Sequence, residues 1–142
     1  MTTITLIVLG GLVAGSTVLG LVYRAFNGRV RRASGREVVR AREIGVTALG
    51  SKATLLQFST EVCAPCRTTN RVLTVLAAEH FTVKHVDLDL THRPDLAARF
   101  SVLQTPTTLI LDGKGAVRAR IGGAPRPETV RLELDRILEA AA

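Results

Sequence analysis

Two cysteines separated by two residues, Cys63 and Cys66, are the clearest sign of chemistry in this sequence of 142 residues. They are the only cysteines of the chain, so a scaffold held by several disulfides is excluded. The C-x-x-C spacing places two thiols one helical turn apart, which lets them form and break a disulfide with each other. The thiolate form of cysteine is the nucleophile in such an exchange. We therefore expect Cys63 and Cys66 to be catalytic redox residues.

Two expected elements would position this pair. The short apolar run Ala53–Ser59 indicates a buried strand, and residues 65–79 carry apolar side chains at helical spacing. A cysteine at the start of that helix faces unpaired N–H groups and the positive end of the helix dipole, which favour a thiolate. Pro65 is tolerated in the first helical turn. We expect the Cys63 thiolate to attack a substrate disulfide and Cys66 to resolve the mixed disulfide.

A structural disulfide and a zinc site are the alternatives to redox chemistry. A bridge that closes so short a loop adds little stability, and such bonds are rare in the cytoplasm. Zinc usually takes four ligands, and a second C-x-x-C is absent from the sequence. The three histidines lie at the end of an expected helix, in a strand and before another helix: His80, His85 and His92. We expect neither a metal nor another cofactor.

The C-terminal part of the chain alternates between strand and helix patterns. The expected elements are strand 53–59, helix 65–79, strand 81–88, helix 94–100, strands 107–111 and 116–121, and helix 127–140. A helix joins the first two strands, so they should be parallel with a right-handed crossover. The turn sequence DGKG makes the last two strands a hairpin. The sequence therefore predicts an α/β domain with a four-stranded mixed sheet and helices on both faces.

The N-terminal segment is long and apolar. Residues 2–23 carry no charged side chain, and about 22 residues in a helix can cross the hydrocarbon core of a bilayer. A cleaved signal peptide normally has basic residues before its apolar stretch, and none precede this one. We expect a retained transmembrane helix with its flanks in residues 1–26, a basic connector in 27–51 and the folded domain in 52–142.

The net charge of +7 is concentrated just behind the apolar segment. Seven arginines and one acidic residue lie between Arg24 and Arg42, whereas the chain from Glu43 onward has twelve basic and eleven acidic side chains. A basic block beside a membrane helix contacts lipid headgroups and tends to stay in the cytoplasm. The nearly neutral domain gives no reason to expect a nucleic-acid partner. We expect a single-pass protein of the cell membrane with its domain on the cytoplasmic side.

Small residues in the apolar segment bear on a partner within the membrane. Gly11 and Gly15 form a G-x-x-x-G pattern, and Ser16 with Gly20 forms a second small-residue pair. This spacing lets two membrane helices approach closely, although glycine is also common in membrane helices in general. A helix-mediated homodimer or another membrane-protein partner is therefore an open alternative to a lone anchor.

Three stretches of this sequence resemble the thioredoxin superfamily. Residues 55–67, LLQFSTEVCAPCR, resemble the central strand and the start of the active-site helix of that family. Val86–Asp89 resembles the next strand, and residues 105–107, TPT, resemble the proline segment before the hairpin. Together the resemblance covers residues 53–138 and implies a thioredoxin-like fold.

The resemblance also implies roles for residues around the cysteines. Pro106 would follow a cis peptide bond and pack against the pair, and the backbone of Thr105 would pair with an extended substrate peptide. Val62, Ala64 and Pro65 would belong to the surface that meets the substrate. Protein disulfides are the substrates that this surface implies.

The sequence departs from the family pattern at several positions. Val62 stands where the family usually has tryptophan, and Ala64 stands where it usually has glycine. Gln57 aligns with the buried acid of the family, but an amide cannot accept a proton. We therefore expect Cys66 to resolve the mixed disulfide more slowly than in a typical thioredoxin. His85 lies near the buried lysine position of the family, and we interpret it as an exposed or structural histidine.

Together these observations predict a membrane-tethered thiol–disulfide oxidoreductase that reduces or exchanges disulfides of client proteins. One alternative is an outward-facing domain that acts as a disulfide reductase or isomerase. Another is a non-catalytic accessory subunit that uses the same fold to hold a membrane protein complex together, because a fold does not by itself establish a function.

Overall fold

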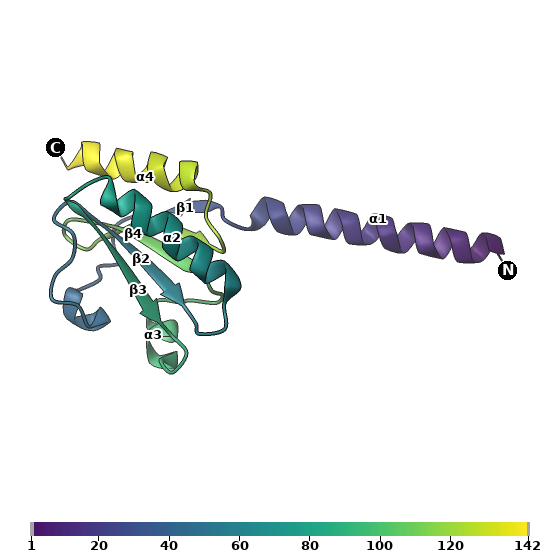
Figure 1. Ribbon diagram of the computed structural model, residues 1–142, viewed down its shortest axis with the longest axis horizontal. Helices are drawn as coiled ribbons and strands as arrows, with labels where there is room; N and C mark the ends of the chain where they lie inside the picture. The colour runs from purple at the N-terminus through teal and green to yellow at the C-terminus, as the bar shows by residue number, and fades with distance from the viewer. Residues whose placement is uncertain (1, 142) are drawn as a thin grey trace.

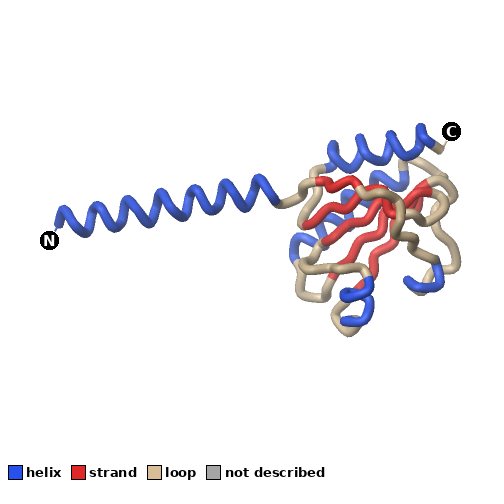
Figure 2. The backbone as a smooth tube through the Cα atoms, turned by 180° about the vertical axis from the view of Figure 1, so that it is seen from behind, coloured by secondary structure: helices blue, strands red, loops and turns tan. Residues whose placement is uncertain are grey.

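The computed structural model describes residues 2–141 of the chain. A long helix, α1 (Thr2–Phe26), projects from a domain built on one β-sheet (Figures 1 and 2). The remaining elements in chain order are β1 (Val30–Arg32), the 3-10 helix η1 (Ala41–Ile44), β2 (Ala53–Ser59), α2 (Ala64–Ala78), β3 (Val83–Asp89), α3 (Pro94–Arg99), β4 (Thr107–Asp112), β5 (Val117–Gly122) and α4 (Pro127–Ala140).

The sheet has the strand order β1-β5-β4-β2-β3. Strands β2 and β3 are parallel and joined through α2, and β4 and β5 form an antiparallel hairpin. Both pairings confirm the expectation from the sequence. Strand β2 lies between β3 and β4, and all seven of its residues are buried.

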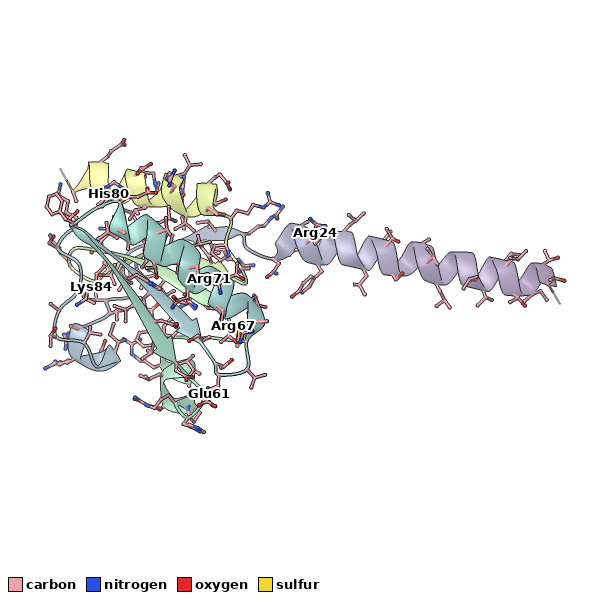
Figure 3. All side chains as sticks on the ribbon, in the orientation of Figure 1. Arg24, Glu61, Arg67, Arg71, His80 and Lys84 are labelled. Carbon is pink, nitrogen blue, oxygen red and sulfur yellow. A yellow bond between two sulfur atoms is a disulfide. The ribbon has the colours of Figure 1, made fainter. Side chains whose placement is uncertain are left out.

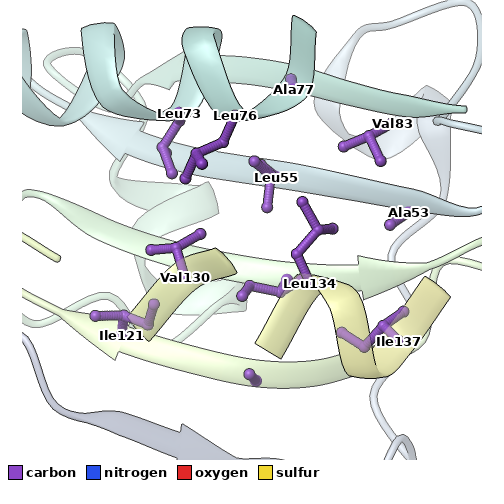
Figure 4. Packing of buried hydrophobic residues seen from close by; sticks show 12 residues of the cluster. Ala53, Leu55, Leu73, Leu76, Ala77, Val83, Ile121, Val130, Leu134 and Ile137 are labelled. Atoms are coloured by element: carbon purple, nitrogen blue, oxygen red, sulfur yellow. The ribbon is translucent and has the colours of Figure 1, made fainter. Parts of the chain in front are cut away.

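Two apolar clusters hold the layers together. On one face, Leu73 and Leu76 of α2 and Val130 and Leu134 of α4 pack against Leu55 of β2 (Figure 4). The second cluster covers the other face, where side chains from α3 and η1 meet the sheet. Burying each large apolar side chain contributes on the order of 2 kcal/mol. The helices therefore cover both faces of the sheet, as predicted.

The seven elements predicted between residues 53 and 140 are all present, with ends that differ by no more than two residues. The number of strands differs, because the sheet has five strands and not four. The additional strand is β1, which lies in the segment expected to be a basic connector. The same segment also contains the single 3-10 turn of η1.

Strand β1 exists because it covers the open edge of β5. Val30 pairs with Ile121 and Arg32 with Ala119 in antiparallel register. The Arg32 guanidinium also donates to the carboxylate of Glu133 on α4 at 3.0 Å. An uncovered edge strand presents unpaired backbone groups, and β1 satisfies those of β5. Three residues with two arginines carry no alternating apolar pattern, so the sequence contains no local sign of this strand.

The segment between β1 and β2 also packs on the domain. Val39 is 1% exposed and Ile44 is 4% exposed, and both belong to the second apolar cluster. The amide of Val39 donates to the carbonyl of Gly115 at 2.8 Å, beside the bridge between Val38 and Ala116. This stretch is therefore packed against the sheet as part of the domain and is not a free tether.

Helix α1 has no buried residue. A stretch of 18 residues within it has a mean hydropathy of 2.1, and the helix is long and apolar enough to cross a membrane. A signal sequence would meet the same criteria. Large apolar side chains such as Leu12, Leu19 and Leu21 are more than 60% exposed along it. Within the described structure, nothing covers this apolar surface.

His85 lies on β3 beneath α2. Its Nδ1 is 3.0 Å from the hydroxyl of Thr74 on α2, and its buried Nε2 has no hydrogen-bond partner among the described residues. Burial lowers the pKa of His85 from its usual 6.5, and the nearby Asp87 carboxylate opposes this in part. The histidine is thus structural and half-buried, which agrees with one of the two interpretations from the sequence.

We expect His85 to make the stability of the domain sensitive to acid. The folded state binds the proton less tightly than the unfolded chain does, so stability is full above the unfolded pKa. It declines as the pH falls through that value towards the lower folded pKa. We would measure urea unfolding of the full chain in detergent at about pH 8 and about pH 5. The free energy of unfolding should fall more between these two pH values for the wild type than for His85→Gln. Equal losses in both proteins would exclude His85 as the cause.

Candidate active site

Cys63 is the N-cap residue of α2 and has extended backbone angles (φ −144°, ψ 92°). Strand β2 ends four residues earlier, at Ser59, and the loop between them brings Cys63 to the start of the helix. Pro65 lies in the first turn, where a missing N–H costs nothing. The amide of Cys66 donates to the carbonyl of Cys63 at 3.2 Å, which closes the turn. Cys63 therefore lies at the positive end of the helix dipole.

Cys63 and Cys66 are joined by a disulfide, with their Cα atoms 5.2 Å apart. Their exposed fractions are 7% and 4%, yet both line a surface pocket of about 310 Å³. The other residues that line this pocket are Ser59, Thr60, Glu61, Arg67, Asn70, Arg71 and Asp87. A second protein can therefore approach the pair from solvent, as an exchange reaction requires.

Gln57 lies directly beneath the second cysteine. It is fully buried on β2, and its side-chain Nε2 donates to the backbone carbonyl of Cys66 at 2.9 Å. The amide oxygen Oε1 is buried and has no hydrogen-bond partner among the described residues. This contact ties the first turn of α2 to the central strand. The side chain contributes a hydrogen-bond donor and an acceptor but no titratable group.

The loop before β4 lies opposite the cysteine loop. The peptide bond between Thr105 and Pro106 is cis, as the resemblance implies. The hydroxyl of Thr105 is 3.3 Å from the hydroxyl of Thr60, which joins the two loops. The carbonyl of Pro106 accepts from the amide of Gly123 at 2.8 Å. Hydrogen bonds on two sides therefore hold this loop in place beside the segment that leads from β2 to Cys63.

A carboxylate lies in the same pocket as the cysteines. Asp87, on β3, is beside Gln57 in the parallel register. Its two oxygens accept from the hydroxyl of Ser59 at 2.6 Å and from the amide of Asn70 at 2.8 Å. These bonds orient the Asp87 side chain towards the end of the sheet where the pocket lies.

The predicted site residues gather at one end of the sheet, where β2 ends and β4 begins. Ala64 and Pro65 are exposed, and Val62 is 97% exposed. Thr105 is half-buried and Pro106 is buried. The substrate roles of these residues stay a prediction.

Sequence reasoning missed Asp87, Asn70 and Leu103 as neighbours of the site. Leu103 is 97% exposed in the loop that leads to the cis-proline. The alternation of β3 could have placed Asp87 on the same face as His85, because residues two apart share a face. No signal in the sequence indicates that Leu103 is exposed. Among residues 2–141, no cluster of three His, Cys, Asp or Glu side chains could hold a metal ion.

Comparisons with known proteins agree with this geometry. The sequence model of the Thioredoxin family matches residues 43–135, which is more than half of the chain. Thioredoxin from Chlamydia trachomatis is 37% identical over 87 residues, covering 59% of this chain and 82% of the relative. Thioredoxin from Mycolicibacterium smegmatis is 36% identical over 91 residues, covering 62% of this chain and 80% of the relative.

A solved structure gives the same result at the level of the fold. The crystal structure of thioredoxin from Trypanosoma brucei brucei superposes with a TM-score of 0.58 at 27% identity, covering 77% of this chain and 97% of the other. The family match begins at residue 43, so α1 and β1 lie outside it. From residue 43 onward, fold, cysteine pair and sequence agree, and the chain therefore belongs to the thioredoxin family and is a thiol–disulfide oxidoreductase.

Proposed function

We propose that this protein is a membrane-tethered oxidoreductase that reduces or exchanges disulfides of client proteins on the cytoplasmic side of the cell membrane. The observation that carries the proposal is the combination of a Cys63–Cys66 disulfide at the head of α2 with an apolar helix that is exposed along its whole length. The first feature supplies the chemistry, and the second supports a position at the membrane.

The chemistry is a two-electron exchange between dithiol and disulfide. The Cys63 thiolate attacks one sulfur of the client disulfide, a mixed disulfide forms, and the other client sulfur leaves as a thiolate that takes up a proton. Cys66 then loses its proton and attacks the sulfur of Cys63. The client leaves as a dithiol, and the Cys63–Cys66 disulfide seen in the structure is the oxidised product. An external dithiol must reduce it again before the next cycle.

We expect Cys63→Ser to abolish catalysis in the full chain, because serine cannot form the mixed disulfide. Cys66→Ser should instead accumulate that intermediate, because the first attack remains and the second is lost. Insulin reduction with dithiothreitol measures turnover, and non-reducing gels measure the trapped adduct.

The matched control is Val75→Ser, a change at an exposed position of the same helix, which should keep wild-type turnover. A strain in which Cys63→Ser retains full biological function would contradict the enzymatic role and favour a non-catalytic accessory subunit.

The membrane position is supported by the length, composition and isolation of α1. An apolar surface of this size in water would cost tens of kcal/mol at ~25 cal/mol per Å². The seven arginines from Arg24 to Arg42 directly follow the uncharged residues 2–23 and place a basic block on the side of the folded domain. Positive-inside asymmetry then favours a cytoplasmic domain. Pairing of two helices through Gly11 and Gly15 stays a prediction.

We expect alkaline phosphatase fused after residue 142 to be inactive and green fluorescent protein at the same place to fluoresce. The enzyme folds only outside the cytoplasm, whereas the fluorescent protein folds inside it. Three lysines added before Thr2 should weaken this orientation, because they reduce the charge asymmetry across the helix. High phosphatase activity in the unmodified fusion would contradict the cytoplasmic placement and support an outward-facing reductase or isomerase.

The removal of the proton from Cys66 is the step at which this site differs from the family pattern, which has a buried acid at the position of Gln57. The Cys66 thiol must lose a proton before the second attack, and Gln57 beneath it cannot take one. Glu61 and Asp87 are the carboxylates that line the pocket, and both lie at the surface. We therefore propose that deprotonation of Cys66 limits release of the reduced client.

We expect Gln57→Asp to speed the second step, by up to on the order of 10²-fold, because it supplies a buried base beside Cys66. Gln57→Leu removes the same hydrogen bond to the Cys66 carbonyl without adding a base, and should bring no gain. Single-turnover reduction of a fluorescent peptide disulfide separates the first attack from client release. An unchanged release rate in Gln57→Asp would show that Gln57 does not limit the step.

A further inference from the structure

We propose that the active-site edge, meaning the end of the sheet where β2 ends and β4 begins, faces the membrane. The client disulfides would then lie in the headgroup layer, on segments that emerge directly from the bilayer. The inference rests on the proposed membrane anchoring and adds to it an orientation and a class of substrate. It depends on strand directions, on the junction between α1 and β1, and on the surface of the exposed edge.

The strand directions bring α1 and the cysteines to the same edge. Strand β1 is antiparallel to β5, β5 is antiparallel to β4, and β4 is antiparallel to β2. The start of β1 therefore lies at the edge where β2 ends and β4 begins. The register confirms this, because Val30, Ile121, Thr108 and Gln57 form one row across the sheet. Gln57 lies under the active site, and Val30 follows the end of α1 by four residues.

The junction between helix and sheet is short and packed. Only residues 27–29 separate α1 from β1. The amide of Asn27 donates to the carbonyl of Tyr23 at 2.9 Å, and the amide of Gly28 donates to the carbonyl of Gly122 at 2.8 Å. Gly28 has a φ of +76°, and a Cβ there would lie 2.5 Å from the carbonyl oxygen of Ala124. The domain is therefore held close to the end of the helix.

Dimensions place the active site just beyond the hydrocarbon core. The uncharged residues 2–23 span about 33 Å as a helix, against a core of about 30 Å, so the core ends near Tyr23. Three strand spacings separate β1 from β2, or roughly 14 Å parallel to the membrane. Figure 3 shows Arg67, at the start of α2, on the side of the domain nearest α1, and His80 at the far end. The cysteines thus lie beside the bilayer surface.

The surface of this edge suits the headgroup layer. Val62 and Leu103 are each 97% exposed and supply two apolar tips. A hollow of about 530 Å³ lies between the end of α1 and the cis-proline loop. Its lining includes Phe26, Leu103 and three arginines, and among the described residues it includes no acidic side chain. Apolar tips, an aromatic ring and arginines complement acyl chains and phosphates at an interface.

This orientation limits the clients. With this edge turned towards the bilayer, the approach of a large soluble protein to the cysteine pair is sterically disfavoured. A cysteine pair that lies within a few residues of a transmembrane segment is already there. The tether also raises the effective concentration of such a client. Membrane proteins with disulfides at the bilayer surface are therefore the substrate class that this geometry selects.

Single tryptophans test the orientation, because the chain has none of its own. We place Val62→Trp at the active-site edge and Phe81→Trp at the opposite edge, just before β3, where Phe81 is fully exposed. Tyr23→Trp serves as the insertion control. Each full-length variant is reconstituted in phosphatidylcholine and phosphatidylglycerol vesicles with or without a spin label on the lipid headgroup. We expect strong quenching for Tyr23→Trp and Val62→Trp and little for Phe81→Trp.

The outcomes separate this inference from the proposed anchoring. If Tyr23→Trp is not quenched, α1 does not insert and the anchoring itself fails. If Tyr23→Trp is quenched but Val62→Trp is quenched no more than Phe81→Trp, the protein is anchored and the orientation is wrong. The readout is independent of redox activity, so loss of catalysis in Val62→Trp does not affect the result.

A second experiment tests the substrate class. The reduced full chain in vesicles is offered a pyridyl disulfide attached to the amine of phosphatidylethanolamine, or the same group on a soluble peptide, and the released pyridinethione is measured. A flexible Gly-Ser segment of ten residues is inserted between Phe26 and Asn27, and the control carries that segment after residue 142. We expect the insertion to lower the ratio of the lipid-linked rate to the soluble rate, and the control to keep it. A ratio that the insertion leaves unchanged would overturn the inference.

Discussion

Strand β2 is buried along all seven residues, and pairing with β3 and β4 holds it in register on both sides. Nearly everything at the active site depends on this strand. Its last residue leads into the loop that sets Cys63 at the start of α2, and its side chains anchor α2 through Leu55 and Gln57. If β2 shifted by one residue, Gln57 would leave the face that carries α2, because neighbouring residues point to opposite faces. The position of the reactive sulfur is therefore a consequence of the packing of the central strand.

The polar groups around the cysteines are arranged unevenly. Beneath Cys66 there is a buried amide that donates to a backbone carbonyl, and its own oxygen has no hydrogen-bond partner within residues 2–141. The carboxylate of Asp87 lies to the side instead, where Ser59 and Asn70 orient it. The site thus separates the group that holds the helix from the groups that can exchange protons with solvent.

The N-terminal residues add a helix and an edge strand that the family match does not include. Helix α1 and strand β1 precede the matched residues 43–135, yet β1 completes the sheet and covers its edge. Only residues 27–29 separate β1 from α1, so the position of this strand also fixes the end of the sheet from which α1 extends. A strand that protects an edge thereby becomes the part that relates the active site to the helix. A flexible tether would have left that relation undefined.

The sequence alone determined the cysteine pair, the elements from Ala53 to Ala140 and the apolar N-terminal helix, because each has a local signature of spacing or periodicity. The cis peptide before Pro106 followed from the family resemblance and not from the residues themselves. Only the tertiary structure decided that residues 30–32 form a strand, since their partner lies near residue 120 and their own pattern is two arginines beside one valine. It alone brought Asp87 into the pocket of the cysteines and the end of α1 to the edge of the active site. Such relations depend on pairing between distant segments, and no local pattern encodes them.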